Sequence, residues 1–155
     1  MKTLILVGTK HGFTQTAAEE LARRLPGSDV LNVALQAKVD LADYDQIVLG
    51  SSIYVGQINK QLAQLIKQQL PTLLTKQIGL FVCCGQAEKA MEQLAAAYPV
   101  ELVEAAQAKG FFGYGFTQLG LAEKLVCKAI GAPIGTRKIN HQEIERFAQK
   151  LGSRV

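Results

Sequence analysis

The sequence predicts an α/β domain in which helices cover both faces of a parallel sheet. Short apolar runs suited to buried strands alternate along the chain with segments of helical period, which is the pattern of such a sheet. The 155 residues are enough for one domain, expected over residues 1–155. Hydrophobic residues make up 48% and charged residues 19%, a composition typical of a soluble globular protein, which argues against a disordered chain.

Five segments are predicted to be strands because apolar residues dominate them and turn residues bound most of them. In chain order they are residues 3–7, 29–34, 46–50, 77–82 and 100–105. The first and third are the most strongly apolar. The second is a weaker strand candidate.

Helices are predicted between the strands from their 3.6-residue period and their end signals. They cover residues 14–25, 59–70 and 88–97. Pro26-Gly27 ends the first helix, Asn59 caps the second, and Pro71 is expected beyond the end of the second. These signals complete the alternation of strands and helices.

After the last predicted strand the chain is expected to run irregularly from Ala108 to Gly115. A further helix is then expected, with one apolar face formed by Leu119, Ala122, Val126 and Ala129. The final helix begins with a motif like a capping box, in which Asn140 caps the helix and Glu143 reaches back to it.

Charge and cysteine content exclude several classes of protein. The net charge of +4 comes from basic residues spread among acids and glutamines, so we expect no nucleic-acid partner. The apolar run 4–7 is too short for a signal peptide or a membrane span, and a cytoplasmic protein is expected. Cys83, Cys84 and Cys127 fit neither a disulfide framework nor a metal motif, and two buried thiols are favoured over a strained Cys83–Cys84 disulfide.

Ligands of open parallel sheets bind at the carboxyl ends of the strands, near the switch in strand order. The first loop, residues 8–14, follows strand one and runs into a helix. Backbone N–H groups, the hydroxyls of Thr9 and Thr14, and the helix dipole favour an anion there, and Gly12 lets the backbone approach it. The loop is neither GxxxxGK[ST] nor GxGxxG, which argues against nucleoside triphosphates and dinucleotides. The alternative is a hydroxyl-rich turn that only caps the helix.

The first loop resembles the phosphate-binding loop of flavodoxins, Thr-x-Thr-Gly-x-Thr, with Thr9, Gly12 and Thr14 at matching positions. His11 stands where flavodoxins usually have Thr, so its backbone N–H is expected to be its contribution. The resemblance implies a flavodoxin-like three-layer sandwich with a five-stranded parallel sheet, and FMN bound without a covalent link. The sequence identifies no catalytic residue.

Two further loops are implied to contact the flavin. In the second loop, residues 51–57, Ser51 and Ser52 offer hydroxyls to phosphate or ribityl oxygens, and Tyr54 offers a ring to stack on the isoalloxazine. Alternatively, Tyr54 only packs on its own loop. The third loop, residues 83–86, offers backbone amides to the pyrimidine edge. Flavodoxins usually place a second aromatic here, but residues 83–97 contain none, so one flavin face is predicted to be open.

The complete set of predicted FMN-binding residues is Thr9, Lys10, His11, Gly12, Phe13, Thr14, Ser51, Ser52, Ile53, Tyr54, Gly56, Cys83, Cys84, Gly85 and Gln86. No metal ligands are predicted.

Over nearly its whole length the chain resembles bacterial menaquinone-dependent protoporphyrinogen oxidases and the flavodoxin-domain proteins grouped with them. The resemblance rests on residues 1–6 before the first loop, Tyr44-Asp45 before strand three, Gly50-Ser51-Ser52-Ile53-x-x-Gly56, and Thr136-Arg137-Lys138. The chain departs from those oxidases after strand four, where they carry a longer basic insertion.

That resemblance implies an oxidoreductase that passes reducing equivalents between a small organic substrate and an acceptor such as a quinone. Phe111 and Phe112 would border the crevice, and Lys109 would hold the protein near the inner face of an anionic membrane. Alternatively, the aromatic cluster of Phe111, Phe112, Tyr114 and Phe116 is core packing.

The second hypothesis is a one-electron carrier with a redox partner protein. Flavodoxins that carry electrons tend to be acidic, however, whereas the net charge of this chain is +4. A phosphoacceptor signalling domain is disfavoured because it needs acidic residues where this chain has Gly8-Thr9 and Gly50-Ser51. The sequence leaves the oligomeric state open.

Overall fold

The computed structural model describes residues 2–9, 12–35, 38–115 and 137–152. Their main sheet has five parallel strands in the order β2-β1-β3-β4-β5. The strands are β1 (Thr3–Gly8), β2 (Asp29–Asn32), β3 (Gln46–Ser52), β4 (Gln77–Cys83) and β5 (Ala106–Phe111). The predicted five-stranded parallel sheet is confirmed, and the strand order reverses between β1 and β3.

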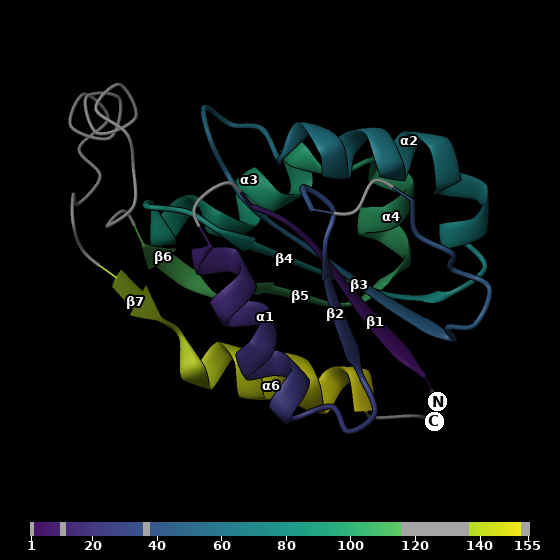
Figure 1. Cartoon of the computed structure of the whole chain (residues 1–155). Helices are drawn as coiled ribbons and strands as arrows, with labels where there is room; N and C mark the ends of the chain where they lie inside the picture. The colour runs from purple at the N-terminus through teal and green to yellow at the C-terminus, as the bar shows by residue number, and fades with distance from the viewer. Residues whose placement is uncertain (1, 10–11, 36–37, 116–136, 153–155) are drawn as a thin grey trace.

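Helices cover both faces of this sheet (Figure 1). On one face lie α1 (Phe13–Arg23) and α6 (His141–Gly152). The other face carries α2 (Lys60–Leu73), α3 (Ala90–Ala97) and α4 (Val100–Ala105), with the 3₁₀ turn η1 (Ala87–Lys89) before α3. The central strands are buried on both faces, which explains their continuous apolar runs. The predicted three-layer sandwich is therefore confirmed.

The predicted strand at 100–105 is wrong, because this segment is helix α4. The carbonyl of Pro99 accepts hydrogen bonds from the N–H groups of Leu102 at 3.0 Å and Val103 at 3.1 Å, which closes the first turn. Leu102 is fully buried, while Glu101 and Glu104 face solvent three residues apart. That spacing suits a surface helix, whereas a strand here would bring these carboxylates toward a covered face of the sheet.

The expectation of an irregular chain from Ala108 to Gly115 is also wrong. The edge strand β5 occupies its first part, and β6 (Gly113–Gly115) pairs antiparallel with β7 (Arg137–Ile139) beyond it. In β5 the residues that face α6, Ala108 and Gly110, are small, because aromatic rings pack directly against the strand. A Cβ at Gly110 would lie 3.0 Å from the ring of Phe112 and 3.1 Å from that of Phe147. Small residues at these positions removed the β-branched signal that sequence reasoning relies on.

Asparagines cap two helices as predicted, but Glu143 does not reach back to Asn140: Asn140 N donates to Phe112 O at 3.0 Å, and the Glu143 carboxylate accepts from Arg146 at 3.3 Å. Asn59 caps α2 by accepting from Leu62 N at 3.1 Å, and Asn140 Oδ1 accepts from Glu143 N at 3.3 Å. Pro71, however, lies inside α2 rather than beyond it. The helix breaks at Gln69 (φ −115°, ψ 17°) and resumes, which places Pro71 in a new first turn that tolerates its missing N–H. The helix expected around Leu119, Ala122, Val126 and Ala129 falls outside the described residues.

Phe112 belongs to the core, so the expectation that it borders a binding crevice is wrong. Its side chain is fully buried and stacks on Phe81 with ring centroids 4.1 Å apart, and Phe147 packs edge-on against both rings. Phe111 is half-buried against the opposite core. Lys109 is exposed on edge strand β5, where a charge discourages pairing with another strand.

Candidate functional site

The first, second and third loops leave neighbouring strands at the same edge of the sheet. Gly8 of β1 pairs with Ser51 of β3, and Ser52 pairs with Cys83 of β4. The chain stays tied just beyond the strands, since Ile53 N donates to Cys83 O at 2.9 Å. The three predicted loops therefore meet where the strand order reverses, the usual ligand position in this architecture.

The first loop closes on itself before α1 begins. Thr9 is buried, and its Oγ1 accepts from Gly12 N at 3.2 Å. Gly12 is the residue before the helix, with φ 83°, a left-handed conformation that favours glycine. Glycine has no side chain, so the residue at the N-cap position provides no hydroxyl to cap the helix. Lys10 and His11 lie outside the described residues.

The start of α1 favours an anion. Its first turn holds no acidic side chain, and the N–H groups of residues such as Thr14 and Gln15 have no acceptor within the helix. The helix dipole adds a partial positive charge at this end. Phe13, also in this turn, is buried in the core beside α1. Its contribution to a ligand site is therefore its backbone.

Thr14 connects all three loops. It is fully buried, and its hydroxyl lies 2.7 Å from that of Ser52. A hydrogen bond also joins Thr14 to the thiol of Cys83. Burial raises the pKa of Cys83 to about 12, with the Thr14 hydrogen bond acting in the opposite direction. One residue from each loop thus belongs to a single polar contact group.

Ser51 and Ser52 have different surroundings. Ser51 is fully buried, and its Oγ accepts from Asn59 N at 2.8 Å and contacts the carbonyls of Ser52 at 2.9 Å and Gly8 at 3.3 Å. Its hydroxyl therefore holds the ends of β1 and β3 to the start of α2. Ser52 is half-buried, which makes it the more accessible of the two hydroxyls.

The second loop forms a protruding two-residue turn. Tyr54 and Gln57 exchange backbone hydrogen bonds of 2.9 and 3.1 Å, and the residues between them, Val55 and Gly56, have φ values of 50° and 73°. Two central residues at positive φ are typical of a type I′ turn. Tyr54 is 48% exposed, while Ile53 packs against the core beneath. The Tyr54 ring is thus available to a ligand.

The third loop is held by the protein itself. Cys83 and Cys84 are both free, buried thiols, as predicted. Cys84 N donates to Gly113 O at 3.1 Å, and its Sγ points at Gln86 O at 3.6 Å. Burial also raises the pKa of Cys84. Gly85 and Gln86 are half-buried and follow directly.

Sequence reasoning missed two residues that position the loops. Asn59 was predicted only as a cap, yet a Cβ on Gly8 would lie 2.6 Å from its Cβ, so it also packs on the end of β1. Gln93 of α3 donates from Nε2 to Gln86 Oε1 at 3.4 Å, and its buried Oε1 has no hydrogen-bond partner among the described residues. A capping asparagine carries no further sequence signal for packing on a strand, and a glutamine on a surface helix carries none for holding a loop.

Within the described ranges, no cluster of three or more His, Cys, Asp or Glu side chains is arranged to hold a metal ion. None of the helices found there is long and apolar enough to cross a bilayer.

Residues 4–148 match a protein family described as flavodoxin domain. The chain belongs to this family. Its fold is also that of solved flavodoxins. The flavodoxin of Streptococcus pneumoniae TIGR4 superposes with a TM-score of 0.61 at 15% identity over 100% of both chains. The Fusobacterium nucleatum flavodoxin bound to flavin mononucleotide gives 0.59 at 12% identity, covering 97% of this chain and 96% of that one.

The curated relatives that match the chain are named as enzymes. The Escherichia coli protoporphyrinogen IX dehydrogenase [quinone] is 34% identical over 77 residues, which are 47% of this chain and 42% of that protein. The similarity to this relative is therefore partial, and the flavodoxin structures resemble the chain over a larger part of its length.

Proposed function

We propose that this flavodoxin-domain protein binds FMN without a covalent link at the edge where the three loops meet. The observation that carries the proposal is the contact group of Thr14, Ser52 and Cys83, which joins all three loops beside the start of α1. A phosphate there would accept from N–H groups of the first turn of α1, with the hydroxyls of Thr14 and Ser52 within the same contact group.

The remaining parts of the site suit the rest of the cofactor. The half-exposed ring of Tyr54 would lie against one face of the isoalloxazine, and the amides of Gly85 and Gln86 would meet its pyrimidine edge. Gln93 would position Gln86 from behind. When bound, FMN supplies one- or two-electron redox chemistry. The protein's part is to hold the ring and to control which molecules reach it.

We further propose that the protein is an oxidoreductase linked to a quinone. Support comes from the relative named as a quinone-linked dehydrogenase and from the absence of aromatic residues in 83–97, which would leave one flavin face open. The porphyrin substrate in that relative's name is not part of the proposal, because this chain lacks a long insertion after β4 and α3 follows promptly. The second candidate is a one-electron carrier, favoured by the full-length likeness to flavodoxins.

Equilibrium titration of the purified protein with FMN and with FAD tests the cofactor. We expect FMN to bind at micromolar affinity or tighter and FAD more weakly, since the start of α1 suits one terminal phosphate. Equal affinity for FAD would contradict the proposed phosphate position. Reductive titration of the FMN complex then separates the two roles. Stepwise one-electron reduction favours the carrier, and direct two-electron reduction favours the enzyme.

A further inference from the structure

The middle of the chain contains no carboxylate side chain. From residue 46 to residue 87 there is no Asp or Glu, while Lys60, Lys67 and Lys76 carry positive charge. This stretch comprises β3, the second loop, α2 and β4. The strands are buried, so its surface is formed mainly by the second loop and the outer side of α2.

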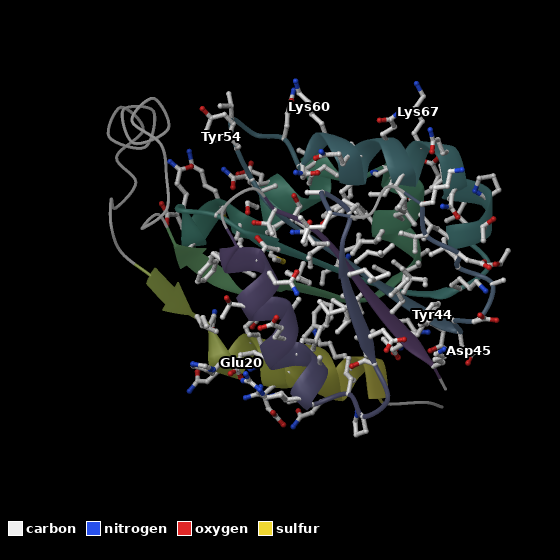
Figure 2. The ribbon with its side chains drawn as sticks, viewed as in Figure 1. Glu20, Tyr44, Asp45, Tyr54, Lys60 and Lys67 are labelled. Atoms are coloured by element: carbon white, nitrogen blue, oxygen red, sulfur yellow. The ribbon has the colours of Figure 1, made fainter. Side chains whose placement is uncertain are left out.

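The exposed positions of α2 form one positive stripe. Lys60, Gln64 and Lys67 are all exposed and spaced four and three residues apart, which places them on one side of the helix. Figure 2 shows both lysines pointing away from the sheet, on the same side of the molecule as Tyr54. Ion pairs such as that of Arg24 with Glu145 join charged side chains of α1 and α6 and the residue that follows α1. Lys60 and Lys67 therefore present charge to solvent.

The second loop adds an apolar end to this stripe. Tyr54 is 48% exposed and Val55 72% exposed, at the turn that leads into α2. We define the α2 face as Tyr54, Val55, Lys60, Gln64 and Lys67. The face is thus a positive, amide-bearing surface with an apolar contact at the end nearest the proposed flavin.

We infer that the α2 face docks a small acidic electron-transfer protein that exchanges electrons with the flavin. The inference rests on the proposed function, because it places the partner beside Tyr54. Carboxylates of the partner would meet Lys60 and Lys67, which steers the encounter, and Tyr54 and Val55 would supply the close apolar contact. Electron-transfer proteins bind one another weakly through small interfaces, so a face of this size suits such a complex.

A lipid surface fits the same face less well. Only Tyr54 and Val55 would enter the apolar layer, while Gln64 and the neighbouring exposed Gln61 and Gln68 would lose hydrogen bonds with water. The two lysines of the face give only weak attraction to anionic lipid. A protein partner can pair with these amides, which favours a protein over a membrane.

The electron balance of the docked complex is simple. A reduced partner with an iron–sulfur centre would give one electron to the bound flavin in each encounter and leave oxidised. Two encounters, with protons taken from water, would supply a full two-electron reduction. Both electrons would then go to the acceptor of the proposed oxidoreductase.

Stopped-flow mixing with a reduced plant-type [2Fe–2S] ferredoxin, which is acidic, tests the inference on the FMN-loaded protein under anaerobic conditions. We expect the second-order rate to fall as salt rises, and Lys67→Glu to lower it about 5- to 10-fold at low salt. Lys150→Glu is the matched control, since Lys150 is an exposed helical lysine on α6, and it should change the rate less than 2-fold. Reduction by dithionite should be the same in all three proteins.

A second measurement separates this inference from the flavin proposal. Binding of oxidised ferredoxin to the flavin-free protein, followed by calorimetry, should also be weakened by Lys67→Glu and not by Lys150→Glu. Equal effects of the two substitutions on ferredoxin binding would overturn the assignment of the α2 face as the docking site. So would unchanged ferredoxin binding together with loss of binding to vesicles containing phosphatidylserine, which would assign the face to a membrane. Failure to load FMN would reject the proposed cofactor and leave the calorimetric result to decide on the docking face.

Discussion

The hydroxyl of Thr14, in the first turn of α1, lies 2.7 Å from the hydroxyl of Ser52 at the end of β3. The two residues are 38 positions apart in the sequence and belong to different loops. Thr14 is fully buried and Ser52 half-buried, so this partly buried contact fixes the first loop against the second. A ligand that binds one loop is therefore held in a defined position relative to the other.

Thr14→Ala should weaken FMN binding by about 1–3 kcal/mol, the range for a lost hydrogen bond to a charged group. Riboflavin, which has no phosphate, should lose much less affinity. Fluorescence titration with both flavins measures the difference. Thr16→Ala is the control, because the Thr16 hydroxyl donates to Gly12 O in the same turn. Equal losses for both flavins would mean that Thr14 acts by holding Ser52 rather than by contacting phosphate.

Reduced, FMN-loaded protein should be oxidised by a soluble menaquinone analogue faster than free reduced FMN. The physical reason is the open flavin face expected from the lack of an aromatic side chain in residues 83–97. Anaerobic stopped-flow absorbance measures both rates. Phe111→Ala should slow the reaction if this half-buried ring borders the acceptor. A rate no greater than that of free FMN would leave the electron carrier as the better proposal.

Gly50→Ala should destabilise the fold by about 3 kcal/mol, the upper part of the range for overpacking a core. A Cβ at this position would lie 2.0 Å from the nearest ring carbon of Phe81, which is itself fully buried. Urea unfolding followed by circular dichroism measures the loss. Gly152→Ala is the control, since no atom lies within 4 Å of a Cβ there. A variant as stable as the parent would mean that the Phe81 ring can move.

Val55→Asn should stabilise the protein by about 1 kcal/mol, because Val55 is a β-branched residue held at φ 50° and asparagine tolerates that conformation far better. The side chain is 72% exposed, so little packing is lost. The urea midpoint should rise at an unchanged m-value. Val100→Asn, at another exposed valine on α4, should bring no such gain. An unchanged midpoint for Val55→Asn would contradict backbone strain in the turn.

Stability should fall as pH rises above about 9, in part because of Cys83. Burial raises the pKa of this thiol from 9.0 to about 12. Below pH 9 the thiol is protonated in both states. Between pH 9 and about 12 the Cys83 thiol is ionised in the unfolded chain and protonated in the folded chain. In this range the thiol therefore lowers the free energy of unfolding by up to about 1.4 kcal/mol per pH unit. Cys83→Ala should show a shallower decline in urea unfolding between pH 8 and 10. Parallel curves would exclude this contribution.

The sequence was a good guide where local signals and burial agree. β1, β3 and β4 combine apolar runs with burial on both faces, and Asn59 and Asn140 cap the helices assigned to them. The positions of the first and second loops followed from these strands. In each case short-range patterning and tertiary packing favour the same structure.

Elsewhere tertiary contacts decided the structure. Ala108 and Gly110 form an edge strand because Phe112 and Phe147 leave no room for larger residues, and this cannot be read from their own propensity. Val100 and Val103 favour a strand locally, yet the carbonyl of Pro99 closes a helical turn. Phe112 was indistinguishable from a ligand-contacting aromatic until its stacking on Phe81 was known.

Because α6 follows every strand of the sheet along the chain, it can cover the core only late in synthesis. In the part of the chain that the structure describes, α1 and α6 cover one face of the sheet, and α6 contributes Ile144, Phe147, Ala148 and Leu151 to that core. Every strand of the sheet precedes α6 along the chain. While the polypeptide emerges from the ribosome, the rings of Phe81 and Phe112 therefore lack part of their cover until α6 arrives. The nascent chain would pass through a stage with an exposed aromatic surface, the kind of surface that chaperones bind.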